Sequence, residues 1–190
     1  MIYSDDRGRT WRRGDIAVPN TEDWVNPSET MAVELSNGRV ALNVRSESKA
    51  HRRLVVTSRD GAHNWSKPEF QPQLVEPICM ASLIGLKSRG RHLLLFSNPD
   101  NLSRADGKEE AGKNRDRRNV TVKVSYDDGR TWPVAKVIEP GLSGYSDLAA
   151  GVDGTIYCLF ERGGKSGDHF KTVALTLARF NLDWLAGAGR

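Results

Sequence analysis

The chain has 190 residues, of which 38% are hydrophobic and 27% charged, and its formal net charge is +4. This composition is ordinary for a soluble globular protein, and no stretch approaches the roughly 18 apolar residues of a membrane helix. The N-terminus lacks the apolar region of a signal peptide, and the scattered basic residues form no nucleic-acid recognition motif. We therefore expect neither a membrane span nor nucleic-acid binding.

Three segments of the chain repeat the pattern S-x-D-x-G-x-T-W. They are Ser4–Trp11, Ser58–Trp65 and Ser125–Trp132, and the second has its Gly one place early and Asn in place of Thr. Their starts are 54 and then 67 residues apart. Such a period suits one four-stranded propeller blade per copy.

The repeated pattern has the chemistry of a tight turn. Its Asp carboxylate can accept hydrogen bonds from backbone N–H groups, and its Gly supplies the positive φ that the turn needs. Its Trp begins the next strand and can pack over the turn as an apolar lid. We therefore interpret Asp6, Asp60 and Asp127 as structural residues and not as members of an active site.

Apolar runs between the repeats predict short strands. Asn37-Gly38 and Asp153-Gly154 predict the tight turns of two hairpins. No segment predicts an amphipathic helix, and the polar stretch 98–118 predicts a long surface loop. The strands are expected at residues 31–36, 39–45, 52–58, 78–86, 92–97, 119–125, 145–150, 155–160 and 171–180.

Two cysteines, Cys79 and Cys158, lie far apart inside apolar runs. Two buried free thiols are the simplest interpretation, and one disulfide between them is the alternative. Their spacing matches no metal-binding pattern, so the cysteines predict no metal site.

The three repeats resemble the Asp-box, or BNR repeat, of bacterial-type exo-α-sialidases (neuraminidases). The resemblance implies an all-β fold, a sialidase-type β-propeller of which this chain forms about three and a half of six blades. Residues 1–190 would then be the C-terminal part of a single propeller domain, and 177–185 resembles the last strand of the family. An incomplete propeller leaves open strand edges, so we expect the isolated chain to associate.

The resemblance assigns the binding of a sugar carboxylate to arginines, whose planar fork donates two parallel bonds and stays charged. Arg45 resembles the second arginine of the family triad. Arg117, eight residues before the third box, resembles the third arginine, with Arg115 and Arg118 as alternatives for that register. Glu29 lies 16 residues before Arg45, and antiparallel pairing would place both at the same end of a hairpin.

Tyr145, 20 residues after Ser125, resembles the family nucleophile. A free phenol has a pKa near 10 and needs a base, and Glu29 is the candidate. Glu161 resembles a supporting Glu that orients the first arginine of the triad. Taken singly, Tyr145 could be a turn residue and Glu161 an ordinary residue at a strand end.

The first arginine of the triad and the acid/base Asp of the family have no counterpart in this chain. The function implied by the resemblance is a retaining exo-α-sialidase that hydrolyses terminal sialic acids from glycoconjugates, without cofactor or metal, here as a truncated or partial chain. A non-catalytic sialic-acid-binding or structural propeller fragment is the alternative. A trans-sialidase is a third possibility, because it passes through the same glycosyl-tyrosine. The resemblance implies a secreted, periplasmic or cell-surface parent protein.

Overall fold

The structure, a computed structural model, describes residues 1–104, 106–107, 115–163 and 171–187. These residues form an all-β fold, as predicted. The strands are β1 (Ile2–Tyr3), β2 (Arg12–Arg13), β3 (Ser28–Glu34), β4 (Val40–Arg45), β5 (Arg52–Ser58), β6 (Glu69–Val75), β7 (Ser82–Ser88), β8 (Arg91–Pro99), β9 (Arg118–Ser125), β10 (Val134–Ala150), β11 (Ile156–Gly163) and β12 (Thr172–Phe180), and a one-turn helix, α1 (Leu182–Leu185), follows.

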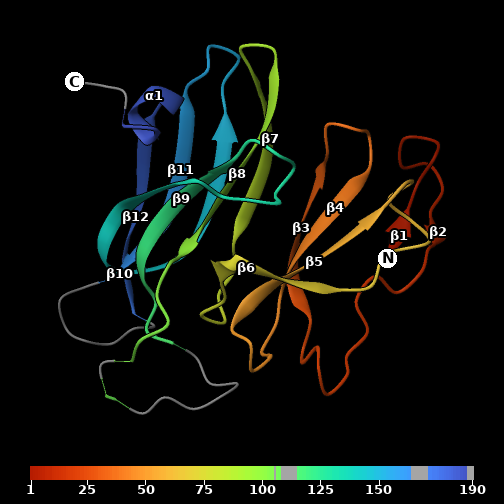
Figure 1. Cartoon of the computed structure of the whole chain (residues 1–190), viewed down its shortest axis with the longest axis horizontal. Helices are drawn as coiled ribbons and strands as arrows, with labels where there is room; N and C mark the ends of the chain where they lie inside the picture. The colour runs from red at the N-terminus through yellow and green to blue at the C-terminus, as the bar shows by residue number, and fades with distance from the viewer. Residues whose placement is uncertain (105, 108–114, 164–170, 188–190) are drawn as a thin grey trace.

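The strands pair with their sequence neighbours in antiparallel sheets, which is the blade arrangement of a propeller. Strands β3–β6 form one blade, and β7–β12 form a continuous six-stranded sheet. Figure 1 shows these two groups side by side, with the β1–β2 hairpin at the outer end of the first. Within the described ranges, α1 is the single α-helix, and it is too short to cross a membrane.

The six-stranded sheet is two blades joined by the 17-residue strand β10. The first half of β10, from Val134 to Leu142, pairs with β9, and the second half, from Ser143 to Ala150, pairs with β11. The register shifts between Ser143 and Ser146, which is a β-bulge. Bulges bend a strand and redirect side chains, and they are over-represented next to active sites.

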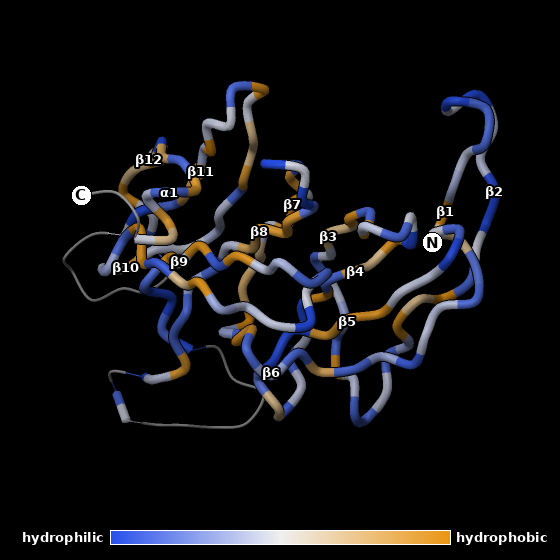
Figure 2. The backbone as a smooth tube through the Cα atoms, turned by 45° about the horizontal axis from the view of Figure 1, so that its top comes forward, coloured by the Kyte–Doolittle hydropathy of each residue, from blue (hydrophilic) through white to orange (hydrophobic). Residues whose placement is uncertain are grey.

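Three apolar clusters fill the spaces within and between these blades. One is formed by β8, β9, the second half of β10 and β11. The second lies between the β3–β6 blade and strands β7 and β8, and the third is formed by side chains of β4 and β5. Figure 2 shows the hydrophobic colour along β5, whereas the tip of the β1–β2 hairpin is hydrophilic. Cys79 and Cys158 are both buried free thiols, which confirms the first interpretation of the pair.

The repeated boxes are turns, as predicted. In the third box, Asp127 accepts hydrogen bonds from the Thr131 backbone N–H at 2.9 Å and from the Thr131 hydroxyl at 2.7 Å. Gly129 has φ +83°, in the left-handed region that glycine adopts without strain. In the first box, the hydroxyl and the backbone N–H of Thr10 donate hydrogen bonds to the Asp6 carboxylate in the same way. These hydrogen bonds lower the pKa of Asp6 to about 2.

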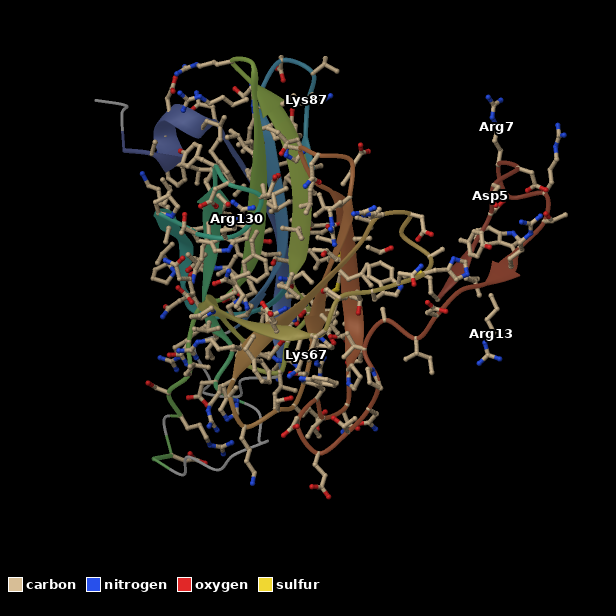
Figure 3. All side chains as sticks on the ribbon, turned by 45° about the vertical axis from the view of Figure 1, so that its right-hand side comes forward. Asp5, Arg7, Arg13, Lys67, Lys87 and Arg130 are labelled. Atoms are coloured by element: carbon tan, nitrogen blue, oxygen red, sulfur yellow. The ribbon has the colours of Figure 1, made fainter. Side chains whose placement is uncertain are left out.

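The tryptophan lids differ between boxes. Trp132 is 5% exposed and meets Phe96 edge-on with ring centroids 5.8 Å apart. Trp11 also lies over its turn, 3.8 Å from where a β-carbon of Gly8 would stand, but it is 61% exposed. The reason is that its hairpin stands away from the body, as Figure 3 shows for the labelled residues Asp5, Arg7 and Arg13.

Strands β1, β2 and β6, the first half of β10 and the helix α1 were not predicted from the sequence. The sequence patterns gave no signal for β1, β2, β6 or the first half of β10, because these segments are short or carry Pro72 and Pro140 among polar residues. The expected terminal strand 177–185 ends at Phe180. The Asn181 side chain then accepts from the Trp184 backbone N–H at 2.9 Å and caps α1.

The expected loop 98–118 is shorter than predicted. Asn98 and Pro99 belong to β8 and Arg118 to β9, and residues 105 and 108–114 lie outside the described part. Both predicted hairpin turns are present, with Gly38 at φ +78° and Gly154 at φ +81°.

Strand β12 is the last strand of its sheet, and its outer face is apolar. Val173, Leu175 and Leu177 are 58%, 69% and 61% exposed, and Leu159 of β11 lies opposite Leu177. We expect the purified chain to form oligomers that grow with concentration, measured by light scattering after gel filtration. The Leu175→Lys/Leu177→Glu variant should shift the distribution toward monomer, and a monodisperse monomer of the unsubstituted chain at all concentrations contradicts the expectation.

Candidate active site

Glu29 and Arg45 lie side by side because β3 and β4 pair antiparallel. The register places Ser28 opposite Arg45, so the start of β3 meets the end of β4. Arg45 donates through Nη1 to Glu29 Oε2 in an ion pair whose side chains are 15% and 31% exposed. The hairpin predicted from Asn37-Gly38 thus brings a carboxylate and a guanidinium to one end of the blade.

Tyr145 reaches this pair from another blade. It lies in the β10 bulge, and its hydroxyl donates to Glu29 Oε1 at 2.5 Å. Arg45 Nη1 also lies 3.4 Å from the Tyr145 hydroxyl oxygen. Residues 116 apart in sequence therefore share one hydrogen-bonded cluster of a carboxylate, a guanidinium and a phenol.

Arg117 packs over Tyr145. Its Cζ lies 5.3 Å from the centroid of the Tyr145 ring, and its Nη2 donates to the Ile78 carbonyl at 2.7 Å. The neighbouring arginines make different contacts. Arg115 Nη2 lies 2.8 Å from His51 Nε2, and Arg118 Nη2 lies 3.9 Å from Asp116 Oδ2. The geometry thus favours Arg117 over the two alternatives.

Glu161 supports the backbone of the same bulge. Its Oε2 accepts a hydrogen bond from the Tyr145 N–H at 2.9 Å. Gly144 leaves the space for this contact, because a β-carbon at position 144 would overlap Glu161 Oε2. All five residues expected at the site are therefore within one cluster of contacts, with Glu161 bonded to the backbone of Tyr145.

The comparisons with known proteins agree with the boxes. The family model described as "BNR repeat-like domain" matches residues 1–158. A sialidase from Micromonospora viridifaciens is 37% identical to the chain in an alignment of 192 positions, which covers 98% of the chain. This chain belongs to the family of the BNR repeat-like domain. A Bacteroides fragilis sialidase is 32% identical over 85% of the chain.

The chain spans about a quarter of these curated relatives, 26% and 28% of their lengths. Among solved structures, the Hadza microbial sialidase Hz136 matches 97% of the chain with a TM-score of 0.74 and 32% identity. The chain covers 32% of that protein. This likeness confirms the sialidase-type propeller fold, of which this chain builds part.

The contacts set the protonation of the cluster formed by Glu29, Arg45 and Tyr145. Burial raises the pKa of Glu29, but the hydrogen bond from Tyr145 and the ion pair with Arg45 outweigh it, and the pKa lies below its ordinary value. The hydrogen bond to Glu29, then burial, raise the pKa of Tyr145 above its ordinary value. At neutral pH Glu29 is therefore an ionised acceptor, and Tyr145 keeps its proton.

If Glu29 is the base of a catalysed reaction, its lowered pKa predicts where the rate falls in acid. The base form of a carboxyl with a depressed pKa persists below the ordinary value of 4.5, so the acid limb of kcat/KM should lie below pH 4.5. The measurement is a pH–rate profile with an aryl sialoside. Arg45→Met should move the limb to higher pH, because it removes the cation that stabilises the carboxylate, and an acid limb above pH 4.5 in the unsubstituted chain contradicts the assignment.

The contact between Gly144 and Glu161 gives a second prediction. In Gly144→Ala the new methyl group displaces the Glu161 carboxylate and breaks its bond to the Tyr145 N–H. We expect a loss of about 0.5–1.5 kcal/mol in the free energy of unfolding, measured by urea denaturation. Glu161→Gln is the matched control, since its amide oxygen can still accept, and an unchanged stability of Gly144→Ala contradicts the prediction.

A buried ion pair next to this cluster was not predicted from the sequence. Arg53 on β5 and Glu76 after β6 are fully buried, with Arg53 Nη1 2.6 Å from Glu76 Oε2. The available signal was an arginine inside the apolar run of β5, but the adjacent Arg52 obscured which of the two faces inward. No sequence pattern linked either residue to Glu76.

Proposed function

We propose that this chain carries the nucleophile side of a retaining exo-α-sialidase site that acts on terminal sialic acids of glycoconjugates. The observation that carries the proposal is the 2.5 Å hydrogen bond between the Tyr145 hydroxyl and Glu29, flanked by Arg45 and Arg117. We also propose that residues 1–190 are the C-terminal part of a single propeller domain.

In the proposed mechanism, Arg45 and Arg117 bind the substrate carboxylate through paired N–H donors. The Tyr145 oxygen attacks the anomeric carbon while Glu29 accepts the phenolic proton. A bond forms between Tyr145 and the sugar, and the bond from the sugar to the aglycone oxygen breaks. The departing oxygen is protonated by a group outside this chain or by water.

In the second step, water attacks the anomeric carbon of the glycosyl-tyrosine. The bond between the sugar and the Tyr145 oxygen breaks, free sialic acid leaves with the oxygen of that water, and Tyr145 recovers a proton from Glu29. The water proton passes to solvent or to a base outside this chain, so atoms and charge balance. Retention of configuration follows from two displacements at one carbon.

A tyrosine suits a substrate that is already anionic. A carboxylate nucleophile would face the carboxylate of the sugar at the reacting carbon, and the two like charges would repel. The neutral phenol avoids that repulsion, and the raised pKa of Tyr145 keeps it neutral until attack. The negative charge of Glu29 stays one hydrogen bond away from the sugar.

The test compares two substrates with the 190-residue chain. An aryl sialoside releases a stable phenolate and needs little protonation, whereas sialyllactose needs a proton donor worth about 10²–10⁴-fold in rate. We expect the fluorogenic aryl sialoside to be cleaved and sialyllactose to be cleaved more slowly by about that factor. No release from the aryl sialoside contradicts the proposal.

A second candidate function is binding of sialic acid without turnover. The favouring observation is the partial exposure of the cluster, 31% for Glu29 and 15% for Arg45, because a site that admits water weakens electrostatic stabilisation. Calorimetric titration with sialyllactose distinguishes the two functions. Saturable binding with no aryl cleavage favours this second candidate.

A further inference from the structure

The Arg53 guanidinium has an acceptor for each of its five N–H groups. Its Nε donates to Asn43 Oδ1 at 2.7 Å, and its Nη1 donates to Glu76 Oε2 at 2.6 Å and to the Cys79 carbonyl at 3.1 Å. Its Nη2 donates to the backbone carbonyls of Glu29 at 3.4 Å and of Asn43 at 3.3 Å. Arg53 thus joins β3, β4, β5 and the segment after β6 at one buried point.

Glu76 extends this network to the segment 76–79. Its Oε1 accepts from the Cys79 N–H at 3.0 Å, while its Oε2 pairs with Arg53. Glu76 and Arg53 therefore hold both the N–H and the carbonyl of Cys79. Such a fully bonded buried pair fixes geometry but is weak evidence of net stabilisation.

Ile78, enclosed by these contacts, has φ +59°. A β-branched residue in the left-handed region is strained, and such strain persists only where surrounding contacts enforce it. The Ile78 carbonyl accepts the hydrogen bond from Arg117 Nη2 at 2.7 Å. The strained turn therefore sets the acceptor that fixes Arg117 over the Tyr145 ring.

We propose that Arg53 and Glu76 are positioning residues that fix Glu29 through its backbone and Arg117 through Ile78. Arg53 bonds the backbone of Glu29, the proposed base. The bonds to Cys79 hold the turn whose Ile78 carbonyl accepts from Arg117, a proposed carboxylate-binding arginine. Neither Arg53 nor Glu76 is exposed, so neither touches the substrate. The kinetic part of this inference rests on the proposed function, whereas the arrangement of Glu29 and Tyr145 can be measured without turnover.

The decisive variant is Arg53→Met/Glu76→Met. Replacing a buried ion pair by apolar residues of similar volume is often neutral or stabilising, so this variant is expected to fold. It removes every hydrogen bond of the network. Glu76→Gln is a second variant, which keeps the shape of the side chain but removes its charge.

The first readout is the ionisation of the Tyr145 phenol, followed by tyrosinate absorbance against the Tyr145→Phe counterpart of each variant. If Glu29 is displaced, the Tyr145 phenol loses its hydrogen bond to Glu29. The pKa of Tyr145 should then fall toward the ordinary value of about 10. The second readout is kcat/KM for an aryl sialoside, which we expect to fall on the order of 10–100-fold. Both KM and kcat should change, because the network supports both Arg117 and Glu29.

Lys123→Met is the matched control for loss of a buried cation. Lys123 donates to the Gln73 carbonyl at 2.8 Å and to Asp100 Oδ1 at 3.0 Å, and neither partner belongs to the cluster. It should leave both readouts unchanged. A folded Arg53/Glu76 variant with the phenol pKa and kcat/KM of the unsubstituted chain overturns the inference, as does failure of both variants to fold.

The outcomes also separate this inference from the proposed function. If the unsubstituted chain shows no cleavage, the proposed function fails, and the phenol titration alone decides the positioning role. If cleavage occurs and neither readout moves in the folded variants, the positioning role fails while the proposed function stands.

Discussion

Tyr145→Phe should abolish sialoside cleavage while leaving the fold intact. The substitution removes the proposed nucleophilic oxygen and its hydrogen bond to Glu29, but it keeps the ring beneath Arg117. Loss of a nucleophile in a covalent mechanism costs on the order of 10⁴–10⁶-fold in kcat. The measurement is the initial rate of fluorophore release from an aryl sialoside, with thermal melting as the check on folding.

Tyr126→Phe is the matched control. Tyr126 belongs to the third box and is 45% exposed, so loss of its hydroxyl should leave the rate unchanged. A Tyr145→Phe variant that retains more than about one tenth of the rate would exclude a tyrosine nucleophile, because no covalent step could then depend on it.

Arg53→Met as a single substitution should produce the largest loss of stability. It leaves the Glu76 carboxylate fully buried without its cation, and breaking one partner of a buried pair costs about 3–5 kcal/mol. Urea denaturation of the single variant should therefore show this decrease in the free energy of unfolding. The Arg53→Met/Glu76→Met variant should recover most of it.

A surface ion pair provides the comparison for that prediction. Arg89 lies 3.1 Å from Asp183 with both side chains largely exposed, and Arg89→Met should cost less than about 1 kcal/mol. Equal losses for Arg53→Met and Arg89→Met would contradict the argument from burial. A double variant no more stable than Arg53→Met would contradict the pairing of Arg53 with Glu76.

The turns and the contact between Glu29 and Arg45 could be predicted from the sequence because local chemistry determines them. Asn37-Gly38 fixes a tight hairpin, and the hairpin fixes which end of β3 meets which end of β4. The boxes are equally local, since Asp127 bonds residues within its own turn. Such features need no knowledge of the rest of the chain.

The buried network could not be predicted, because its partners come from separate strands. Nothing in the residues around Arg53 indicates that its partner is Glu76, 23 positions later. The positive φ of Ile78 is likewise enforced by tertiary contacts, since isoleucine disfavours that conformation. Arg117 was expected from its register before the third box, but the contact of Arg115 with His51, 64 positions away, could not be predicted.

Strand β10 shows the same limit in the fold. Pro140-Gly141 suggests an interruption, yet the strand continues through register shifts on either side of Glu139 and serves two blades. A sequence pattern cannot show that one strand ends one blade and begins the next. The bulge that carries Tyr145 follows from that double role.

Covalent trapping tests the central claim, a tyrosine nucleophile, most directly. In 2,3-difluorosialic acid the anomeric substituent is fluoride, which leaves with little need for a proton donor, so the 190-residue chain alone can be used. After incubation, intact-mass measurement and peptide mapping should find one fluorosialyl adduct, on the peptide that contains Tyr145. An adduct on Glu29 or on any other residue, or no adduct in folded protein, contradicts the assignment.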